Sequence, residues 1–167
     1  MSLKKPIVLP PIIIDTREQK PFEFQSATVR EKLDIGDYSL RGMTNHFAIE
    51  RKELNDLIGC MISKEGNRNR DRFERELERA RTGLRRLWII CEGSFGDICA
   101  GNYRSEIKVA SVVATLLAWQ NRYNVSFIFA GGRKAANRLA YLVLERSYVD
   151  YIEKKLPEYK LPKNATN

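Results

Sequence analysis

Residues 47–56, with the sequence FAIERKELND, constrain the fold of this chain more than any other segment. The apolar start of the segment is typical of a strand, in which successive side chains point to opposite faces of a sheet. Glu50 and Lys52 therefore share one face, and Ile49 and Arg51 share the other. The pattern predicts a strand that enters the core with one face and carries a carboxylate and an amine on the opposite face.

The rest of the chain alternates between short apolar runs and stretches with helical periodicity. Strand-rich sequence comes first and alternating helices and strands follow, which predicts one α/β domain with a mixed central sheet flanked by helices. Residues 38–51 are expected to form an antiparallel hairpin or meander with Asp37 near one end. Strands are predicted at residues 12–14, 29–33, 38–40, 46–51, 87–91 and 125–129, and helices at residues 53–61, 70–81, 107–120 and 133–146.

Three segments carry further expectations. The helix at residues 107–120 is apolar on nearly all sides, so it is either fully buried or part of an interface. Residues 63–69 are polar and contain a glycine, which predicts a mobile loop. The domain is expected to span residues 1–150, and the polar, proline-containing tail at residues 151–167 is expected to be loose.

The composition indicates a folded protein with a polyanionic partner. Hydrophobic residues make up 43% and charged residues 30% of the 167 residues, which excludes a disordered chain. The net charge of +8 favours nucleic acid over a membrane surface, because no basic amphipathic segment with exposed aromatic residues stands out. No apolar run approaches the ~20 residues of a membrane span. We expect an intracellular protein of the cytoplasm or nucleoid, or of the nucleus in a eukaryote.

Cysteine and histidine do not form a recognisable metal motif in the sequence. Cys60, Cys91 and Cys99 lack CxxC spacing and lie in apolar contexts, which predicts buried free thiols in a reducing compartment. The single histidine, His46, is expected to have a structural role at a strand start.

Acidic residues at predicted strand ends form a candidate catalytic group. Asp15 ends the first strand, Asp37 lies at a turn, and Asp56 follows the pair Glu50 and Lys52 by about one helical turn. Two converging carboxylates can hold a hard divalent cation, and a nearby lysine can activate a water or steady the phosphate. These are the parts of a site for metal-dependent phosphodiester hydrolysis.

The same residues also have an ordinary structural interpretation. Glu50 and Lys52 can form a solvated pair on a strand surface, and Asp15 can simply end a strand. In the catalytic interpretation, Arg17 is expected to hold a phosphate oxygen in a bidentate contact. Residue type and spacing leave both interpretations open.

Three blocks of sequence, in a fixed order, resemble a known family. They are IDTRE at residues 14–18, GDY at residues 36–38 and IERKxxxD at residues 49–56. Over about residues 12–146 the chain resembles the nuclease domain of the XPF-type structure-specific endonucleases, as in archaeal Hef. That family has a restriction-endonuclease-like core, and its signature is Gly-Asp followed by Glu-Arg-Lys-x-x-x-Asp, with Asp-x-Arg-Glu upstream.

The resemblance implies a divalent-metal-dependent DNA endonuclease that acts in DNA repair or recombination on branched, fork or flap DNA. It also implies a homodimer formed through this domain. The implied cofactor is Mg²⁺ or Mn²⁺, bound by Asp37, Glu50 and the backbone carbonyl of Arg51, and Lys52 matches the family's catalytic lysine. The residues that match the family's active site are Asp15, Arg17, Asp37, Glu50, Arg51, Lys52 and Asp56.

The segment after the third block departs from the family, because it is longer and more basic than the usual Ser-Ile-x-Asp-Gly-Arg-Tyr type of segment. Arginines spaced three or four residues apart predict a stripe on the helix at residues 70–81, which is expected to contact phosphates near the cut site. The alternative is a solvated helix with i,i+4 ion pairs. A second basic group follows Gly131-Gly132, where a simple turn is the alternative. The predicted DNA-contacting residues are Arg68, Arg70, Arg72, Arg75, Arg79, Arg133 and Lys134.

Two other functions stay open at this point. A non-catalytic DNA-binding or scaffold protein would share the fold but would lose the acidic residues, and all of them are present here. A nuclease that acts on ordinary duplex DNA would keep them, and the fold does not distinguish it.

Overall fold

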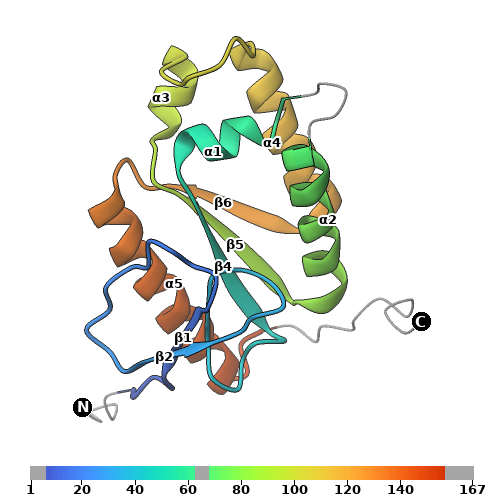
Figure 1. Ribbon diagram of the computed structural model, residues 1–167. Coiled ribbons are helices and arrows are strands. Elements are labelled where there is room, and N and C mark those ends of the chain that lie inside the picture. The colour runs from blue at the N-terminus through green and yellow to red at the C-terminus, as the bar shows by residue number, and fades with distance from the viewer. Residues whose placement is uncertain (1–6, 63–67, 157–167) are drawn as a thin grey trace.

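The chain forms a six-stranded mixed sheet that has helices on both faces (Figure 1). The structure is a computed structural model that describes residues 7–62 and 68–156. The strands in these ranges are β1 (Ile12–Asp15), β2 (Thr28–Glu31), β3 (Tyr38–Leu40), β4 (Phe47–Lys52), β5 (Arg86–Cys91) and β6 (Val125–Phe129). The helices are α1 (Leu54–Gly59), α2 (Arg68–Gly83), α3 (Phe95–Ala100), α4 (Val109–Tyr123) and α5 (Arg133–Ile152).

The strand order across the sheet is β2-β1-β3-β4-β5-β6. β1 runs parallel to β2 and antiparallel to β3, and β3 runs antiparallel to β4. β4, β5 and β6 run parallel to one another, with helices in the connections between them. The predicted α/β class, the mixed sheet and the antiparallel pairing of residues 38–51 are confirmed. Because Tyr38 pairs with Ile49, the turn before β3 lies beside the carboxyl end of β4.

Different helices cover the two faces of the sheet, and each covered face forms one half of the core. On one face, Phe73 of α2 and Trp119 of α4 pack in a cluster with Ala48 of β4. On the other face, Ala140 of α5 packs in a second cluster with Ile49. β4 therefore belongs to both halves, because its side chains alternate between them.

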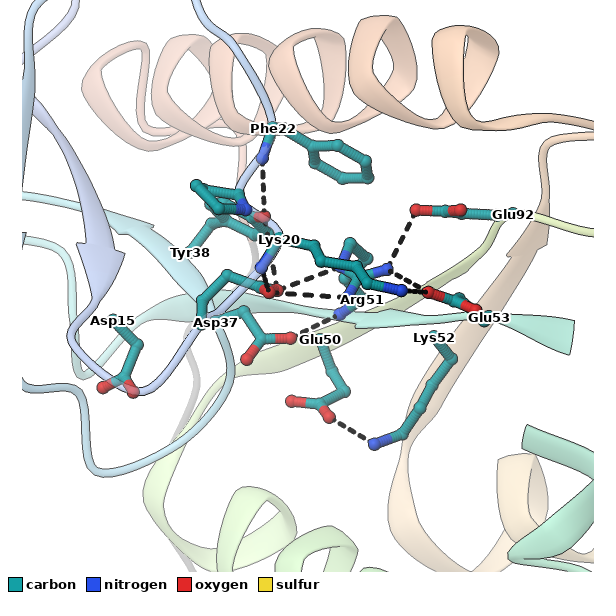
Figure 2. Close-up of polar contacts among 12 residues, drawn as sticks. Asp15, Lys20, Phe22, Asp37, Tyr38, Glu50, Arg51, Lys52, Glu53 and Glu92 are labelled. Carbon is teal, nitrogen blue, oxygen red and sulfur yellow. Dashed lines mark hydrogen bonds and ion pairs between the residues drawn. The ribbon is translucent and has the colours of Figure 1, made fainter. Parts of the chain in front are cut away.

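The alternation along β4 continues past its apolar residues. Glu50 and Lys52 lie on the face covered by α2, where their side chains meet at 2.6 Å. Arg51 points toward the face covered by α5 (Figure 2). The prediction that Glu50 and Lys52 share one face of a core strand is confirmed.

Several elements differ from the sequence expectation. α2 begins at Arg68 and α5 ends at Ile152, so both helices are longer than predicted. Hydrophobic periodicity does not predict the short helix α3. Ser94 caps this helix: its hydroxyl accepts the Asp97 N–H at 2.9 Å, and the Asp97 carboxylate accepts the Ser94 N–H at 3.0 Å. The Ser-x-x-Asp pattern is the signal from which this helix is recognisable.

α4 is not fully buried, although it is apolar on nearly all sides. Val112, Leu116 and Trp119 are buried, whereas Leu117 is 57% exposed. The fully buried alternative for this helix is therefore wrong, because only the stripe that faces the sheet and α2 is covered. The interface alternative stays a prediction.

The cysteines and the histidine lie largely where the sequence placed them. Cys60 and Cys91 are buried free thiols as predicted, but Cys99 is exposed. The expectation for Cys99 is wrong because α3 is short and buries Ile98 while leaving its neighbour outside. His46 precedes β4, and its ring lies 4.7 Å from that of Tyr151.

Two sequence expectations concern residues outside the described ranges. Most of the predicted loop at residues 63–69 lies there, and its last two residues, Arg68 and Asn69, instead begin α2. Residues 157–167 of the predicted tail also lie outside. Within the described ranges, no helix is both long enough and apolar enough to cross a membrane.

Gly36 allows the turn before β3 to approach the backbone of β4 closely. Its φ is +78°, and a Cβ atom built on it would lie 2.8 Å from the carbonyl oxygen of Ile49. The same oxygen accepts the Asp37 N–H at 2.7 Å. A glycine is therefore required here, and the close approach brings Asp37 beside β4.

We expect Gly36→Ala to lower the free energy of unfolding by about 2–3 kcal/mol, because positive φ and a clash with the β4 backbone act together. Gly42→Ala is a matched control. Gly42 has a similar φ of +83°, but the described structure leaves open space around its added Cβ. The control is expected to cost only about 1 kcal/mol. Urea unfolding compares the two variants, and equal losses would show that the approach to Ile49 carries no steric penalty.

Candidate active site

Asp37 and Glu50 come together because two hydrogen bonds fasten the turn before β3 to β4. The Asp37 N–H donates to the Ile49 carbonyl at 2.7 Å, and the Arg51 N–H donates to Asp37 Oδ2 at 2.8 Å. These bonds involve the residues on either side of Glu50 in the chain. The two acidic side chains therefore project side by side from neighbouring segments (Figure 2).

Both carboxyl groups are held in surroundings that disfavour negative charge. Burial raises the pKa of Asp37 to about 6, although the bond from the Arg51 N–H partly opposes this. Burial, together with the negative charge of Asp37, raises the pKa of Glu50 well above its usual value. Glu50 is only 6% exposed. Such a pair is stable only with a nearby positive charge or with a retained proton.

Lys52 supplies one positive charge to this pair. Its Nζ lies 2.6 Å from Glu50 Oε1. Burial alone would lower the pKa of Lys52, but the charge and hydrogen bond of Glu50 raise it above its usual value. Lys52 is therefore an ammonium at neutral pH, suited to neutralising negative charge rather than to accepting a proton.

The oxygen donors of Asp37 and Glu50 suit a hard divalent cation. Mg²⁺ is commonly held by one or two carboxylates together with waters and substrate phosphates. Across residues 7–62 and 68–156, no group of three or more His, Cys, Asp or Glu side chains is arranged as a complete metal site. A cation held by this pair would take its other ligands from water and substrate phosphate. The Arg51 carbonyl, the third ligand expected from the sequence, stays a prediction.

The Arg51 side chain forms a partly buried ion-pair network on the other face of β4. Its guanidinium lies 3.0 Å from Glu18 Oε2 and 2.9 Å from Glu92 Oε1. Burial alone would raise the pKa of Glu18, but the bonds from Arg51 and from the Lys20 N–H bring it below its usual value. Arg51 thus ties β4 to the loop after β1 and to the end of β5, and its guanidinium faces away from the acidic pair (Figure 2).

Asp15 fastens the loop that follows β1. Its carboxylate accepts the Arg17 N–H at 2.9 Å and the Leu33 N–H at 2.6 Å, and it contacts the Arg17 guanidinium at 2.7 Å. Burial alone would raise the pKa of Asp15, but these hydrogen bonds lower it. Its contacts are thus those of a loop anchor. The exposed guanidinium of Arg17 also donates to the Leu33 carbonyl at 2.7 Å. Its pKa is raised mainly by the hydrogen bond to Asp15, and the charges of Glu76 and Asp37 contribute less.

For two other acidic residues, the electrostatic influence on the acidic pair differs from what the sequence motif suggests. Asp56 is exposed in the first turn of α1, and it is not among the main electrostatic influences on Asp37 or Glu50. Glu76 of α2 is among them, because its negative charge raises the pKa of both carboxyl groups. The motif does not include Glu76, but its place three residues after buried Phe73 is the signal that puts it on the inner side of α2.

Of the arginines of α2, Arg70 points inward, Arg81 pairs with Glu78 in the last turn, and the other four are exposed. Arg70 bonds the Met61 carbonyl at 2.9 Å and pairs with Glu74 at 3.1 Å, so it joins α2 to the end of α1. The other four lie on the face opposite buried Phe73 and Leu77, as the predicted stripe requires. The exposed residues are Arg68, Arg72, Arg75 and Arg79.

Arg133, at the start of α5, makes several contacts within the protein. Its guanidinium contacts Glu92 Oε1 at 2.7 Å and donates to the carbonyls of Lys20 and Pro21 at 2.8 and 2.9 Å. A phosphate would have to compete with these bonds. Lys134 beside it is exposed. DNA contact by either residue stays a prediction.

The structure thus gathers an acidic pair and an ammonium around the carboxyl end of β4. The pair Asp37 and Glu50 can bind a divalent cation, and Lys52 can neutralise charge on a phosphate. The Arg17 guanidinium already donates to the Asp15 carboxylate and to the Leu33 carbonyl, so a phosphate would have to compete with these bonds. The arrangement has the components of a site for hydrolysis of a phosphodiester.

The fold and the sequence were compared with known proteins. The structure is similar to XPF from Aeropyrum pernix, with a TM-score of 0.64 and 18% identity over 92% of this chain and 68% of that chain. It is also similar to XPF from Aeropyrum pernix in complex with DNA, with a TM-score of 0.61 and 20% identity over 89% of this chain and 68% of that chain. At these identities the likeness shows the fold alone. Among curated protein sequences, none matches.

The sequence also matches a protein family. The match is to the ERCC4 domain and covers residues 14–143. It includes all three sequence blocks, and with them the residues that the structure gathers at the end of β4. Because this match spans most of the chain, the protein belongs to the ERCC4 domain family, that of the XPF nuclease domain.

Proposed function

We propose that this protein is a divalent-metal-dependent DNA endonuclease. The observation that carries the proposal is the pair of half-buried Asp37 and buried Glu50, with the Lys52 ammonium 2.6 Å from Glu50. The raised pKa of both carboxyl groups marks a place where a cation is electrostatically favoured. A solvated pair on a strand surface would be exposed, whereas Glu50 is 6% exposed.

The residues around the pair have distinct roles in this proposal. Asp37 and Glu50 hold Mg²⁺ or Mn²⁺, which supplies Lewis acidity and a more acidic water. Lys52 neutralises negative charge that develops on the phosphate oxygens. Arg17 binds the phosphate, and Asp56 is retained as a catalytic candidate from the family motif. Asp15 and Arg51 act through the loops and strands that they hold in place.

The proposed substrate is branched, fork or flap DNA. Family membership supports it, and XPF from Aeropyrum pernix has been solved in complex with DNA. An intracellular location goes with such a substrate. A nuclease of ordinary duplex DNA is the second candidate, since the same fold serves both substrates. The presence and convergence of the acidic residues disfavour a non-catalytic scaffold.

Cleavage assays on fork, flap, nicked and plain duplex DNA, each with Mg²⁺ or Mn²⁺, test the proposal directly. We expect cleavage that needs the metal ion and that is faster on branched substrates. Equal rates on plain duplex would select the second candidate. DNA binding without cleavage of any substrate would select the scaffold.

We expect Asp37→Asn to lose activity and to gain stability. Cleavage should fall by about 100-fold or more, because half of the acidic pair is gone. The pKa of Asp37 is about 6 in the folded protein against an ordinary 3.8, so its ionisation destabilises the fold as pH rises through this range. Asparagine cannot ionise and still accepts the Arg51 N–H. At pH 7.5 the metal-free variant should therefore be more stable by about 1–3 kcal/mol.

Thermal melting of metal-free protein at pH 4 and at pH 7.5 measures this second effect. The difference between variant and wild type should shrink toward pH 4, because Asp37 is then almost fully protonated in the folded state and the pH approaches its ordinary pKa of 3.8 in the unfolded state. Asp34→Asn is the control, because Asp34 is exposed and lies outside the acidic pair. A less stable Asp37→Asn at pH 7.5 would contradict the electrostatic account of the pair.

The exposed arginines of α2 are proposed to contact DNA phosphates. We expect Arg68→Gln with Arg72→Gln to weaken DNA binding and to reduce the slope of log affinity against log salt by about 1.8 on duplex DNA. The control, Arg41→Gln with Arg146→Gln, removes the same charge from other surfaces. Arg41 follows β3 at the end of that strand away from Asp37. If the α2 variant keeps the wild-type slope, the stripe is ordinary solvated surface.

A homodimer is proposed from exposed apolar residues on α4 and α5. Leu117 of α4 is 57% exposed and Leu142 of α5 is 41% exposed, and a dimer interface would cover them. We expect sedimentation at micromolar concentration to give the mass of a dimer. Leu117→Glu with Leu142→Glu should shift the protein toward monomer. A wild-type monomer under these conditions would overturn the dimer.

A further inference from the structure

We infer that Phe73 is a positioning residue for Lys52, and that the face of its ring fixes the ammonium beside Glu50. The inference rests on the proposed nuclease function, which gives the placement of Lys52 its catalytic consequence. Phe73 lies on α2, outside the three sequence blocks, and its helical spacing alone indicates an ordinary core residue.

The Lys52 ammonium has two neighbours of different kinds. Its Nζ is 2.6 Å from Glu50 Oε1 and 4.9 Å from the centre of the Phe73 ring. A cation within about 6 Å of a ring centre is attracted by the negative face of the ring, more strongly where water is excluded. The Lys52 side chain is 18% exposed and Phe73 is 2% exposed. The contact is therefore well shielded from solvent.

The ring is itself held in orientation by neighbouring helices. Phe73 meets Trp119 edge to face, with centroids 5.2 Å apart and planes at 70°. The Trp119 Nε1–H donates to Glu74 Oε1 at 3.0 Å, and Glu74 also pairs with Arg70. Because α2 and α4 fix the ring in this way, the face that it presents to Lys52 is constant.

Glu50 alone does not define the position of the ammonium. Lysine carries its charge on a flexible four-carbon stem, and a single ion pair leaves its direction free. Glu50 is also a proposed metal ligand, so its charge is shared between two cations. The Phe73 ring bears no net charge and competes for neither metal nor phosphate. The ring therefore attracts the Lys52 ammonium whether or not Glu50 also binds a metal ion.

Stepwise fluorination of the Phe73 ring tests the inference, because fluorine withdraws electron density from the ring face and largely preserves its shape. Fluoro-, trifluoro- and pentafluorophenylalanine are incorporated at position 73 of the full chain. We expect kcat on the best DNA substrate to fall progressively, by about 3- to 30-fold for the fully fluorinated ring. KM and DNA affinity should stay at wild-type values. Pentafluorophenylalanine at Phe127, which contacts Trp119 but not Lys52, is the control and should leave kcat unchanged.

A kcat that is insensitive to fluorination at position 73 would overturn the inference, and so would an equal fall in the Phe127 control. A purely structural role predicts a change that follows thermal stability rather than the number of fluorines. Phe73→Tyr, which keeps an electron-rich ring, should retain more activity than Phe73→Leu at matched stability.

A second measurement uses metal-free protein and needs no activity. Urea unfolding compares the natural and pentafluorinated rings in wild type and in a Lys52→Met background. We expect fluorination to lower the equilibrium constant for folding in both backgrounds. The factor should be about two- to five-fold larger with Lys52 present than in the Lys52→Met background. Equal effects in the two backgrounds would overturn the inference. Retained coupling in a protein that cleaves no DNA would refute only the proposed function and would leave the Lys52–Phe73 contact established.

Discussion

The repulsion between a half-buried carboxylate, Asp37, and a buried one, Glu50, governs how the surrounding segments are arranged. Burial raises the pKa of both carboxyl groups, and the negative charge of Asp37 raises the pKa of Glu50 further. Their proximity is therefore unfavourable in itself, and the surrounding backbone has to enforce it. β4 enforces this proximity through Ile49, which is fully buried and whose carbonyl accepts the Asp37 N–H. The close approach at Gly36 completes the constraint.

The ion pairs on the far face of β4 contribute to the same constraint. Arg51 bridges Glu18 and Glu92, and Arg133 binds Glu92 from α5. Ion pairs shielded from solvent add little net stability, but removing Arg51 would leave buried Glu18 without its main positive partner, which is unfavourable. The network therefore favours one register between β4, the loop after β1 and the start of α5. A motif arginine can thus be needed for activity although its guanidinium points away from the acidic pair.

Local sequence predicts some parts of this site and not others. The alternation along residues 47–52 is enough to place Glu50 and Lys52 together, because strand geometry determines it. Arg51 has its partners 33 and 41 residues away, and which acids it meets depends on the order of strands in the sheet. The influence of Glu76 likewise depends on how α2 docks against the sheet. The short helix α3 is recognisable from its Ser-x-x-Asp capping pattern, whereas the exposure of Cys99 depends on tertiary packing.

α2 connects the outer surface of the protein to the interior of the site. Its exposed face carries the arginine stripe, while its inner face presents Phe73 to Lys52 and places the charge of Glu76 near the acidic pair. Because one rigid helix carries both faces, its position against α4 determines the electrostatics of the pair as well as the placement of any phosphate that the arginines bind. The edge-to-face contact of Phe73 with Trp119 sets that position. Packing at this junction therefore belongs to the chemistry of the site, although neither ring carries a charge.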